Sequence, residues 1–176
     1  MFLRNAVLGV TLTLLPLSAT GIAAAQDTKE KAAPVKQEDG KWYDADGNPT
    51  FHIGDDGSVD WYTFSGYRRY HSDCHVCHGP DGVGSSYAPA LADSLKTMDY
   101  GTFLSTVAEG RKNVGGGKEN VMPAFGDNKN VMCFINDLYV YLKARGHALP
   151  AGQLGGRNRD EKPEQAKAEE KACLGS

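Results

Sequence analysis

The chain is built around five residues, Cys74-His75-Val76-Cys77-His78. Cys-x-x-Cys-His is the attachment signature of c-type haem. Two thiols at this spacing can form thioethers with the two vinyl groups of one porphyrin, and the histidine that follows then lies under the iron. The motif therefore predicts one covalent haem c, attached through Cys74 and Cys77, with His78 as the proximal iron ligand.

Two other uses of a close cysteine pair remain as alternatives. A zinc site needs a second pair of ligands at short spacing, whereas the other two cysteines, Cys133 and Cys173, are isolated in the sequence. A thioredoxin-like redox pair needs a βαβ context, which the residues around the motif do not indicate. Haem attachment is the favoured interpretation of the motif.

The second axial ligand is predicted to be Met122. A thioether ligand favours ferrous iron and suits a haem that transfers electrons. Met122 lies in a stretch expected to be a non-helical loop, and Pro123 stiffens the backbone after it. Met132 is expected in a helix, where methionine is usually part of the core, and Met98 directly precedes a predicted helix. These two methionines, a histidine or an open site are the alternatives.

Two further contacts to the haem site are expected. The Pro89 carbonyl can accept from the outer nitrogen of His78 and fix its tautomer; a plain loop proline is the alternative. Arg111 or Lys112 is expected near a haem propionate, with an exposed charged loop as the alternative. The remaining histidines are predicted to be surface or packing residues: His52, His71, His75 and His147.

Residues 1–25 have the pattern of a secretory signal peptide. They combine Arg4, a short apolar run and a small-residue cleavage site at residues 23–25, so cleavage is expected before Gln26. A retained membrane anchor is the alternative, but the apolar run is short for a membrane span and Pro16 breaks it. The mature protein is expected to be soluble and periplasmic.

Export also bears on the two remaining cysteines. Haem attachment uses two of the four cysteines, and an exported compartment permits disulfides. Cys133 and Cys173 are therefore predicted to form a disulfide, which would close a loop of roughly forty residues and contribute about 2–4 kcal/mol. Two free thiols are the alternative.

The charge of the chain argues against some partners. The formal net charge is −3, and loss of Arg4 with the signal peptide makes it −4. A mildly acidic protein is a poor match for nucleic acid or anionic lipid. We expect neither nucleic-acid binding nor stable membrane insertion.

Composition divides the rest of the chain. Residues 26–40 are polar and charged and predict a flexible linker. Residues 41–60 contain short aromatic or β-branched pieces between Asp-Gly turns, which predicts a small β-hairpin or irregular flap. Three apolar residues of this flap are expected to pack on the core: Trp42, Phe51 and Ile53.

Capping residues and apolar spacing predict the helices. Asp60 is expected to cap a helix that leads into the haem motif, and Asp99 a helix that Gly110 ends. Further helices are expected over residues 130–145 and from Pro163 to Lys171. The glycine-rich stretch between them, residues 111–120, predicts a surface loop.

These residues resemble a class I cytochrome c over about residues 61–147. The matching positions, in order, are Gly66, Tyr70, Cys74, Cys77, His78, Gly79, Pro89, Met122, Pro123 and Phe125, followed by the aromatic helix. The resemblance implies an all-α fold around one covalent haem, preceded by the flap and followed by a tail over residues 148–176. It also implies that the first and last helices cross near Gly66 and that His78 and Met122 hold the haem in a crevice.

A narrower resemblance covers roughly residues 41–175. The Trp42-Tyr43 flap, the aromatic run that starts at Asp60 and the two extra cysteines are similar to those of four-cysteine, methanol-metabolism-related c-type cytochromes. That group includes cytochrome c-L-like electron acceptors of quinoprotein alcohol dehydrogenases, of both calcium and lanthanide types.

This resemblance implies a periplasmic monohaem electron carrier rather than an enzyme. It would accept single electrons from a methanol or alcohol dehydrogenase with pyrroloquinoline quinone and pass them to a downstream cytochrome or oxidase. We expect a monomer. A generic cytochrome for another dehydrogenase and a haem sensor or peroxidase-like protein are the alternatives.

Overall fold

The computed structural model of this protein describes residues 31–115, 118–154 and 158–175. The predicted signal peptide (1–25) and the first part of the predicted linker (26–30) lie outside the described residues. Among the described residues, no helix has the length and apolar character needed to cross a bilayer.

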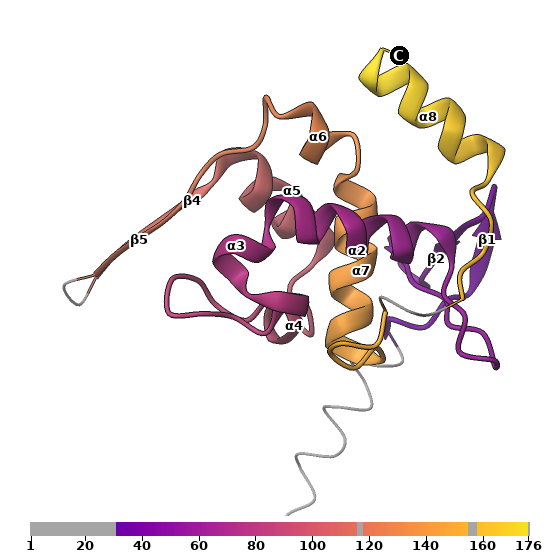
Figure 1. Cartoon of the computed structure of the whole chain (residues 1–176), viewed down its shortest axis with the longest axis horizontal. Helices are drawn as coiled ribbons and strands as arrows, with labels where there is room; N and C mark the ends of the chain where they lie inside the picture. The colour runs from indigo at the N-terminus through magenta and orange to yellow at the C-terminus, as the bar shows by residue number, and fades with distance from the viewer. Residues whose placement is uncertain (1–30, 116–117, 155–157, 176) are drawn as a thin grey trace, which may run out of the picture.

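Two helices form the centre of the fold. Helix α2 (Trp61–Asp73) crosses helix α7 (Ile135–His147), as Figure 1 shows. The crossing depends on Gly66, because a Cβ there would lie 1.9 Å from the carbonyl oxygen of Asp137. The predicted crossing of the first and last helices at this glycine is confirmed, and the fold is mostly helical, as the resemblance implies.

Short helices surround this pair. Helix α5 (Tyr100–Glu109) begins at Asp99, whose carboxylate accepts from Thr102 N at 2.8 Å. Asp60 caps α2 in the same way, accepting from Thr63 N at 2.9 Å. Both predicted N-caps are confirmed. The remaining short helical segments are α3 (His75–His78), the 3₁₀ turn η1 (Pro80–Gly82), α4 (Leu91–Ser94) and α6 (Lys129–Met132).

The N-terminal flap is a three-stranded antiparallel sheet in the order β1-β2-β3. Its strands are β1 (Lys36–Glu38), β2 (Lys41–Tyr43) and β3 (Pro49–Thr50). Strand β1 falls in the stretch expected to be a linker, where pairing with β2 orders the chain despite its polar composition. As predicted, Phe51 is buried and Ile53 packs on the core, while Trp42 stacks on His52 with ring centroids 4.3 Å apart.

The expected loop over residues 111–120 is instead a hairpin, so this prediction is wrong. Strands β4 (Arg111–Gly115) and β5 (Lys118–Met122) pair antiparallel, and the hairpin projects from the body (Figure 1). Glycine content suggested a loop, but the residues between the glycines include β-branched and long side chains that tolerate extended backbone.

The expected continuous helix over residues 130–145 is divided into α6 and α7. Phe134 leaves helical geometry, with φ −124° and ψ 19°. At the other end, Gly146 does not end the helix, which continues to His147. A Cβ on Gly146 would lie 2.9 Å from the carbonyl oxygen of Ala92, so the glycine allows α4 to approach α7 closely.

The C-terminal tail is fixed to the body at several points. Helix α8 (Glu164–Leu174) begins after Pro163, as expected. Cys133 and Cys173 form a disulfide that joins this helix to the junction of α6 and α7. The Lys41 ammonium also contacts the Glu169 carboxylate at 2.6 Å. The tail and the flap are thereby held on the same side of the α2–α7 pair.

Candidate haem-binding site

The Cys-x-x-Cys-His motif forms one helical turn at the end of α2. Cys74 is the C-cap of α2, and its carbonyl accepts from His78 N at 3.0 Å. Cys74 and Cys77 both carry free thiols, with Cys77 exposed, while His78 is buried. The turn places two thiols and an imidazole together, as attachment and ligation of one porphyrin require.

The imidazole of His78 is oriented by Pro89. Its Nδ1 lies 2.9 Å from the Pro89 carbonyl oxygen. A carbonyl oxygen can only accept, so Nδ1 donates and the lone pair of the neutral ring is on Nε2. Among the described residues, Nε2 has no hydrogen-bond partner and is available to bind a metal. The structure therefore contains the predicted hydrogen bond between His78 and the Pro89 carbonyl.

The segment after His78 is bound to α2 and to the motif itself. The Tyr70 hydroxyl donates to the Gly79 carbonyl at 2.6 Å, and Tyr70 is fully buried. Gly84 N donates to the His78 carbonyl at 2.8 Å, and the Ser85 hydroxyl donates to the Cys77 carbonyl at 2.5 Å. These bonds close the loop that runs from the motif toward Pro89.

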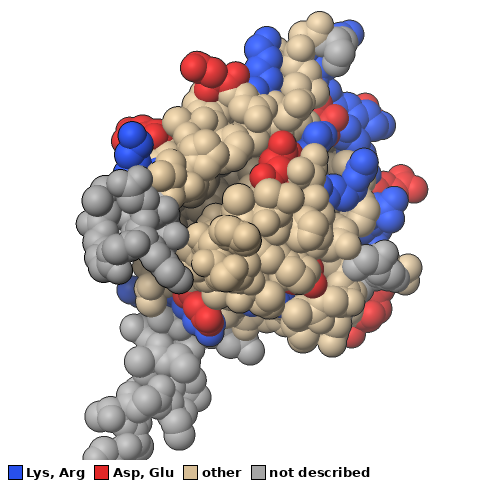
Figure 2. Space-filling view, turned by 60° about the vertical axis from the view of Figure 1, so that its left-hand side comes forward, with Lys and Arg blue, Asp and Glu red and all other residues tan. Residues whose placement is uncertain are grey.

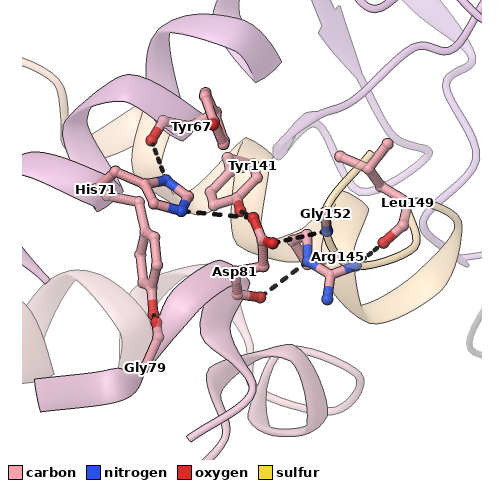
Figure 3. A network of polar contacts seen from close by, with 9 residues as sticks. Tyr67, His71, Gly79, Asp81, Tyr141, Arg145, Leu149 and Gly152 are labelled. Carbon is pink, nitrogen blue, oxygen red and sulfur yellow. Dashed lines mark hydrogen bonds and ion pairs between the residues drawn. The ribbon is translucent and has the colours of Figure 1, made fainter. Parts of the chain in front are cut away.

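Asp81 connects this segment to the rest of the core (Figure 3). One carboxylate oxygen accepts from the Tyr141 hydroxyl at 2.9 Å, and the other from Gly152 N at 2.7 Å. The Asp81 carbonyl accepts from the Arg145 guanidinium at 2.8 Å. Asp81 itself has a left-handed backbone, with φ 53°, which aspartate tolerates better than most residues.

His71 completes the network on the side of α2. Its Nδ1 donates to the Tyr67 carbonyl at 2.9 Å, and its Nε2 lies 3.5 Å from the Asp81 carboxylate (Figure 3). The sequence predicts only a surface or packing role for His71. The Gly-Pro-Asp-Gly turn after the haem motif is the one sequence feature that points to Asp81, because aspartate bonds backbone groups in turns.

Met122 is the last residue of β5 rather than part of a free loop. It is partly buried against the core. In the β4–β5 register its partner is Arg111, so these two expected site residues are neighbours across the strands. Arg111 and Lys112 are both exposed.

The other two methionines considered as ligands also pack on the core. Met98 precedes the N-cap of α5, and Met132 ends α6. Both are partly buried. For Met132 this matches the core role that the sequence predicts for a helical methionine.

Figure 2 shows the face that carries the left-hand elements of Figure 1. A hollow in this face lies among residues other than Lys, Arg, Asp and Glu, and most charged side chains lie around its margin (Figure 2). An apolar macrocycle suits such surroundings better than a highly charged ligand does. The two free thiols and the available Nε2 of His78 are the groups that attachment and ligation of a haem need.

The structure also bears on the two alternative uses of the cysteine pair. Burial raises the pKa of the Cys74 thiol to about 12, with smaller contributions from Asp73 and Cys77. A thioredoxin-like pair needs a lowered thiol pKa, so the redox alternative is disfavoured. In the described part of the chain, no three His, Cys, Asp or Glu side chains gather in a way that could hold a metal ion.

Comparison with known proteins gives a consistent picture. The family profile described as cytochrome C oxidase, cbb3-type, subunit III matches residues 64–142. Cytochrome c-553I of Paracoccus denitrificans is 51% identical over 142 residues, which are 80% of this chain and 62% of that protein. The match thus spans less than two thirds of this relative's length.

Matches to two further proteins extend over a larger share of those proteins. Cytochrome c-555 of Methylococcus capsulatus is 40% identical over 98 residues, which are 54% of this chain and 73% of that protein. The crystal structure of the c-type cytochrome XoxG from Methylobacterium extorquens AM1 superposes with a TM-score of 0.77 at 56% identity. That match covers 85% of this chain and 91% of XoxG.

Proposed function

This chain belongs to the c-type cytochromes, a family of electron carriers with covalently bound haem c, and from that membership we propose a specific role. The protein is a periplasmic carrier that accepts single electrons from a quinoprotein methanol or alcohol dehydrogenase. It passes them to a downstream cytochrome or oxidase. Electron transfer, rather than substrate chemistry, is its function.

The observation that carries the proposal is the geometry of the single Cys-x-x-Cys-His turn. His78 is held through Nδ1 by the Pro89 carbonyl, at 2.9 Å, and Nε2 is left for iron. In this role Cys74 and Cys77 would form the thioethers, and His78 and Met122 would bind the iron. Haem in such a site supplies one-electron chemistry by cycling between ferric and ferrous iron.

The residues of the chain keep this site in one geometry through both oxidation states. The Pro89 carbonyl maintains the tautomer and orientation of His78. The proposed Met122 thioether favours the ferrous form. Arg111, exposed beside Met122 in the β4–β5 register, is proposed to approach a propionate and offset its charge.

Features outside the haem motif support the proposed partner. The Trp42-Tyr43 flap and the two extra cysteines carry the resemblance to the four-cysteine, methanol-metabolism-related group. In this chain they form a three-stranded sheet and the Cys133–Cys173 disulfide. The similarity to XoxG and to cytochrome c-555 from Methylococcus capsulatus extends over most of those two chains.

The proposed compartment is the periplasm, reached through the signal peptide over residues 1–25. A disulfide suits an oxidising compartment, and covalent haem attachment takes place there in bacteria. We propose that the mature protein begins at Gln26 and acts as a monomer. Transfer then occurs in transient encounters with small interfaces, under about 1,200 Å².

Stopped-flow kinetics tests the partner. The ferric cytochrome is mixed with a reduced methanol dehydrogenase that contains pyrroloquinoline quinone, and the haem absorbance is followed. An unrelated class I cytochrome serves as the control acceptor. We expect faster reduction of this protein than of the control; equal rates would remove the partner assignment and leave a generic carrier.

Substitution of the distal ligand tests the closed, six-coordinate site. In Met122→Ala the ferric thioether charge-transfer band should disappear, and carbon monoxide should bind the ferrous protein readily. Met132→Leu is the matched control and should keep the band. Survival of the band in Met122→Ala, or ready binding of carbon monoxide to the unmodified protein, would instead support an open site or another ligand.

A further inference from the structure

The last turn of α5 lies against the segment that follows Met122. The chain leaves α5 at Glu109, forms the projecting β4–β5 hairpin and returns at Met122 (Figure 1). Because Met122 pairs with Arg111, the end of β5 is brought back to the end of α5.

Backbone hydrogen bonds join the two segments beyond Met122. The last carbonyls of an α-helix have no partner within the helix. In α5 the Val107 carbonyl accepts from Phe125 N at 3.0 Å, and the Ala108 carbonyl accepts from Gly126 N at 3.0 Å. Two of the free carbonyls of α5 are thus used to bind the chain just after Met122.

Gly110 is where the two segments come closest. Its φ of 73° is in the left-handed region that favours glycine. A Cβ on Gly110 would lie 2.6 Å from the carbonyl oxygen of Met122, 2.7 Å from Ala124 N and 2.8 Å from the carbonyl carbon of Pro123. All three are backbone atoms, so no side-chain rotation could relieve the overlap, and the methionine segment itself would have to move.

We propose that Gly110 and the last turn of α5 position Met122, so that α5 determines whether the methionine sulfur reaches the iron. This inference rests on the proposed role of Met122 as distal ligand. Gly110 acts as a positioning residue through the backbone of residues 122–124. The distal ligand is therefore held by a helix end that precedes it in the chain.

A graded pair of substitutions tests the proposal. Gly110→Ala introduces the overlap with Met122 together with backbone strain. Gly126→Ala is milder, because its Cβ would lie 3.0 Å from the Ala108 carbonyl oxygen and its φ is not positive. We expect Gly110→Ala to lose most of the ferric thioether band and to bind imidazole about tenfold more tightly. Gly126→Ala should change both readouts in the same direction but less.

Two matched glycines provide controls. Gly101→Ala is in the same helix, and its nearest contact would be an ordinary 3.4 Å from the Asp99 carboxylate. Gly47→Ala carries the same kind of positive-φ strain, at 78°, with nothing within 4 Å of the new Cβ. Both should keep the band and the imidazole affinity of the unmodified protein, since a general loss of stability does not by itself remove the methionine.

The possible outcomes separate the two levels of the proposal. If the unmodified protein shows no thioether band, the assignment of Met122 fails and this inference fails with it. If the unmodified protein shows the band and both Gly110→Ala and Gly126→Ala retain it unchanged, the inference alone is wrong. If Gly110→Ala does not acquire haem, the thioether band of Gly126→Ala tests the inference: a weakened band supports it and an unchanged band contradicts it.

Discussion

On the His78 side of the site, side chains from α2 and α7 donate hydrogen bonds to the segment after the histidine, whereas on the Met122 side the hydrogen bonds join backbone groups. Tyr70 and Tyr141, both fully buried, donate to the Gly79 carbonyl and the Asp81 carboxylate. Around Met122 the bonds run from backbone amides to the carbonyls at the end of α5.

Because of this difference, we expect the His78 side to determine global stability and the Met122 side to determine ligation of the iron. The His78 side is continuous with the crossing of the central helices, so a change there should alter the free energy of unfolding. The Met122 segment is partly exposed and attached through a helix end, and such segments open at lower cost than the core. A change there should alter ligation of the iron while leaving global stability nearly unchanged.

The largest effect is expected from Gly66→Ala, which disturbs the crossing of α2 and α7 that supports the His78 side. The new Cβ would lie 1.9 Å from the Asp137 carbonyl oxygen and 2.7 Å from the Tyr141 Cβ, so α2 and α7 would have to separate. We expect a loss of more than about 3 kcal/mol in the free energy of unfolding, measured by chemical denaturation of the haem-loaded protein. Gly101→Ala is the control and should cost less than about 0.5 kcal/mol.

Removal of the disulfide should have the next largest effect. Cys133 and Cys173 are separated by 40 residues, and a cross-link of this span contributes about 2–4 kcal/mol. The double variant Cys133→Ser, Cys173→Ser should lose that amount in denaturation while keeping the thioether band, because the bridge joins α8 to the α6–α7 junction and not to Met122. Loss of the band at low denaturant would show that the bridge also supports the distal side.

The sequence predicts the His78 side better than the Met122 side, for a physical reason. Groups that form thioethers or bind iron are particular side chains at particular spacings, so the motif alone is enough to propose Cys74, Cys77 and His78. The same is true of the Asp60 and Asp99 caps, which the structure confirms. Roles of this kind depend on the type of side chain, so the sequence alone can predict them.

Contacts between backbone groups are harder to predict from the sequence, because they depend little on the type of side chain. The hairpin over residues 111–122 brings Arg111 opposite Met122, but its glycines suggest a loop. The need for a glycine at position 110 comes from a segment that lies beyond the hairpin, which local pattern cannot reveal. The division of the predicted helix at Phe134 is likewise not indicated by the local pattern, which continues through this residue.

A buried carboxylate on α7 should make the His78 side pH-dependent. Burial raises the pKa of Asp137 to about 7, while the Ser65 hydroxyl and Lys41 act against this rise. The folded state therefore binds a proton that the unfolded chain has lost between about pH 4 and pH 7. The contribution of Asp137 to the free energy of unfolding is therefore fully present below about pH 4 and is lost as the pH rises to about 7.

The Asp137→Asn variant tests this dependence. The limiting slope is about 1.4 kcal/mol per pH unit, and we expect the free energy of unfolding to decline between about pH 4 and pH 7 with a slope no steeper than this. Denaturation at several pH values should show that slope in the unmodified protein and a flatter one in Asp137→Asn, whose amide can still accept from Ser65. Equal slopes in the two proteins would mean that Asp137 does not titrate in this interval.

The smallest change is the most informative about the two sides. Tyr70→Phe removes only the hydroxyl that donates to the Gly79 carbonyl at 2.6 Å, so it should cost about 1 kcal/mol of stability and leave the thioether band intact. Gly110→Ala should do the reverse, with a weakened band and a smaller loss of stability than Gly66→Ala. Denaturation and the ferric spectrum of the same samples measure both effects. If Tyr70→Phe weakened the band as much as Gly110→Ala did, the two ligand segments would form one cooperative unit, and the separation of stability from ligation would not hold.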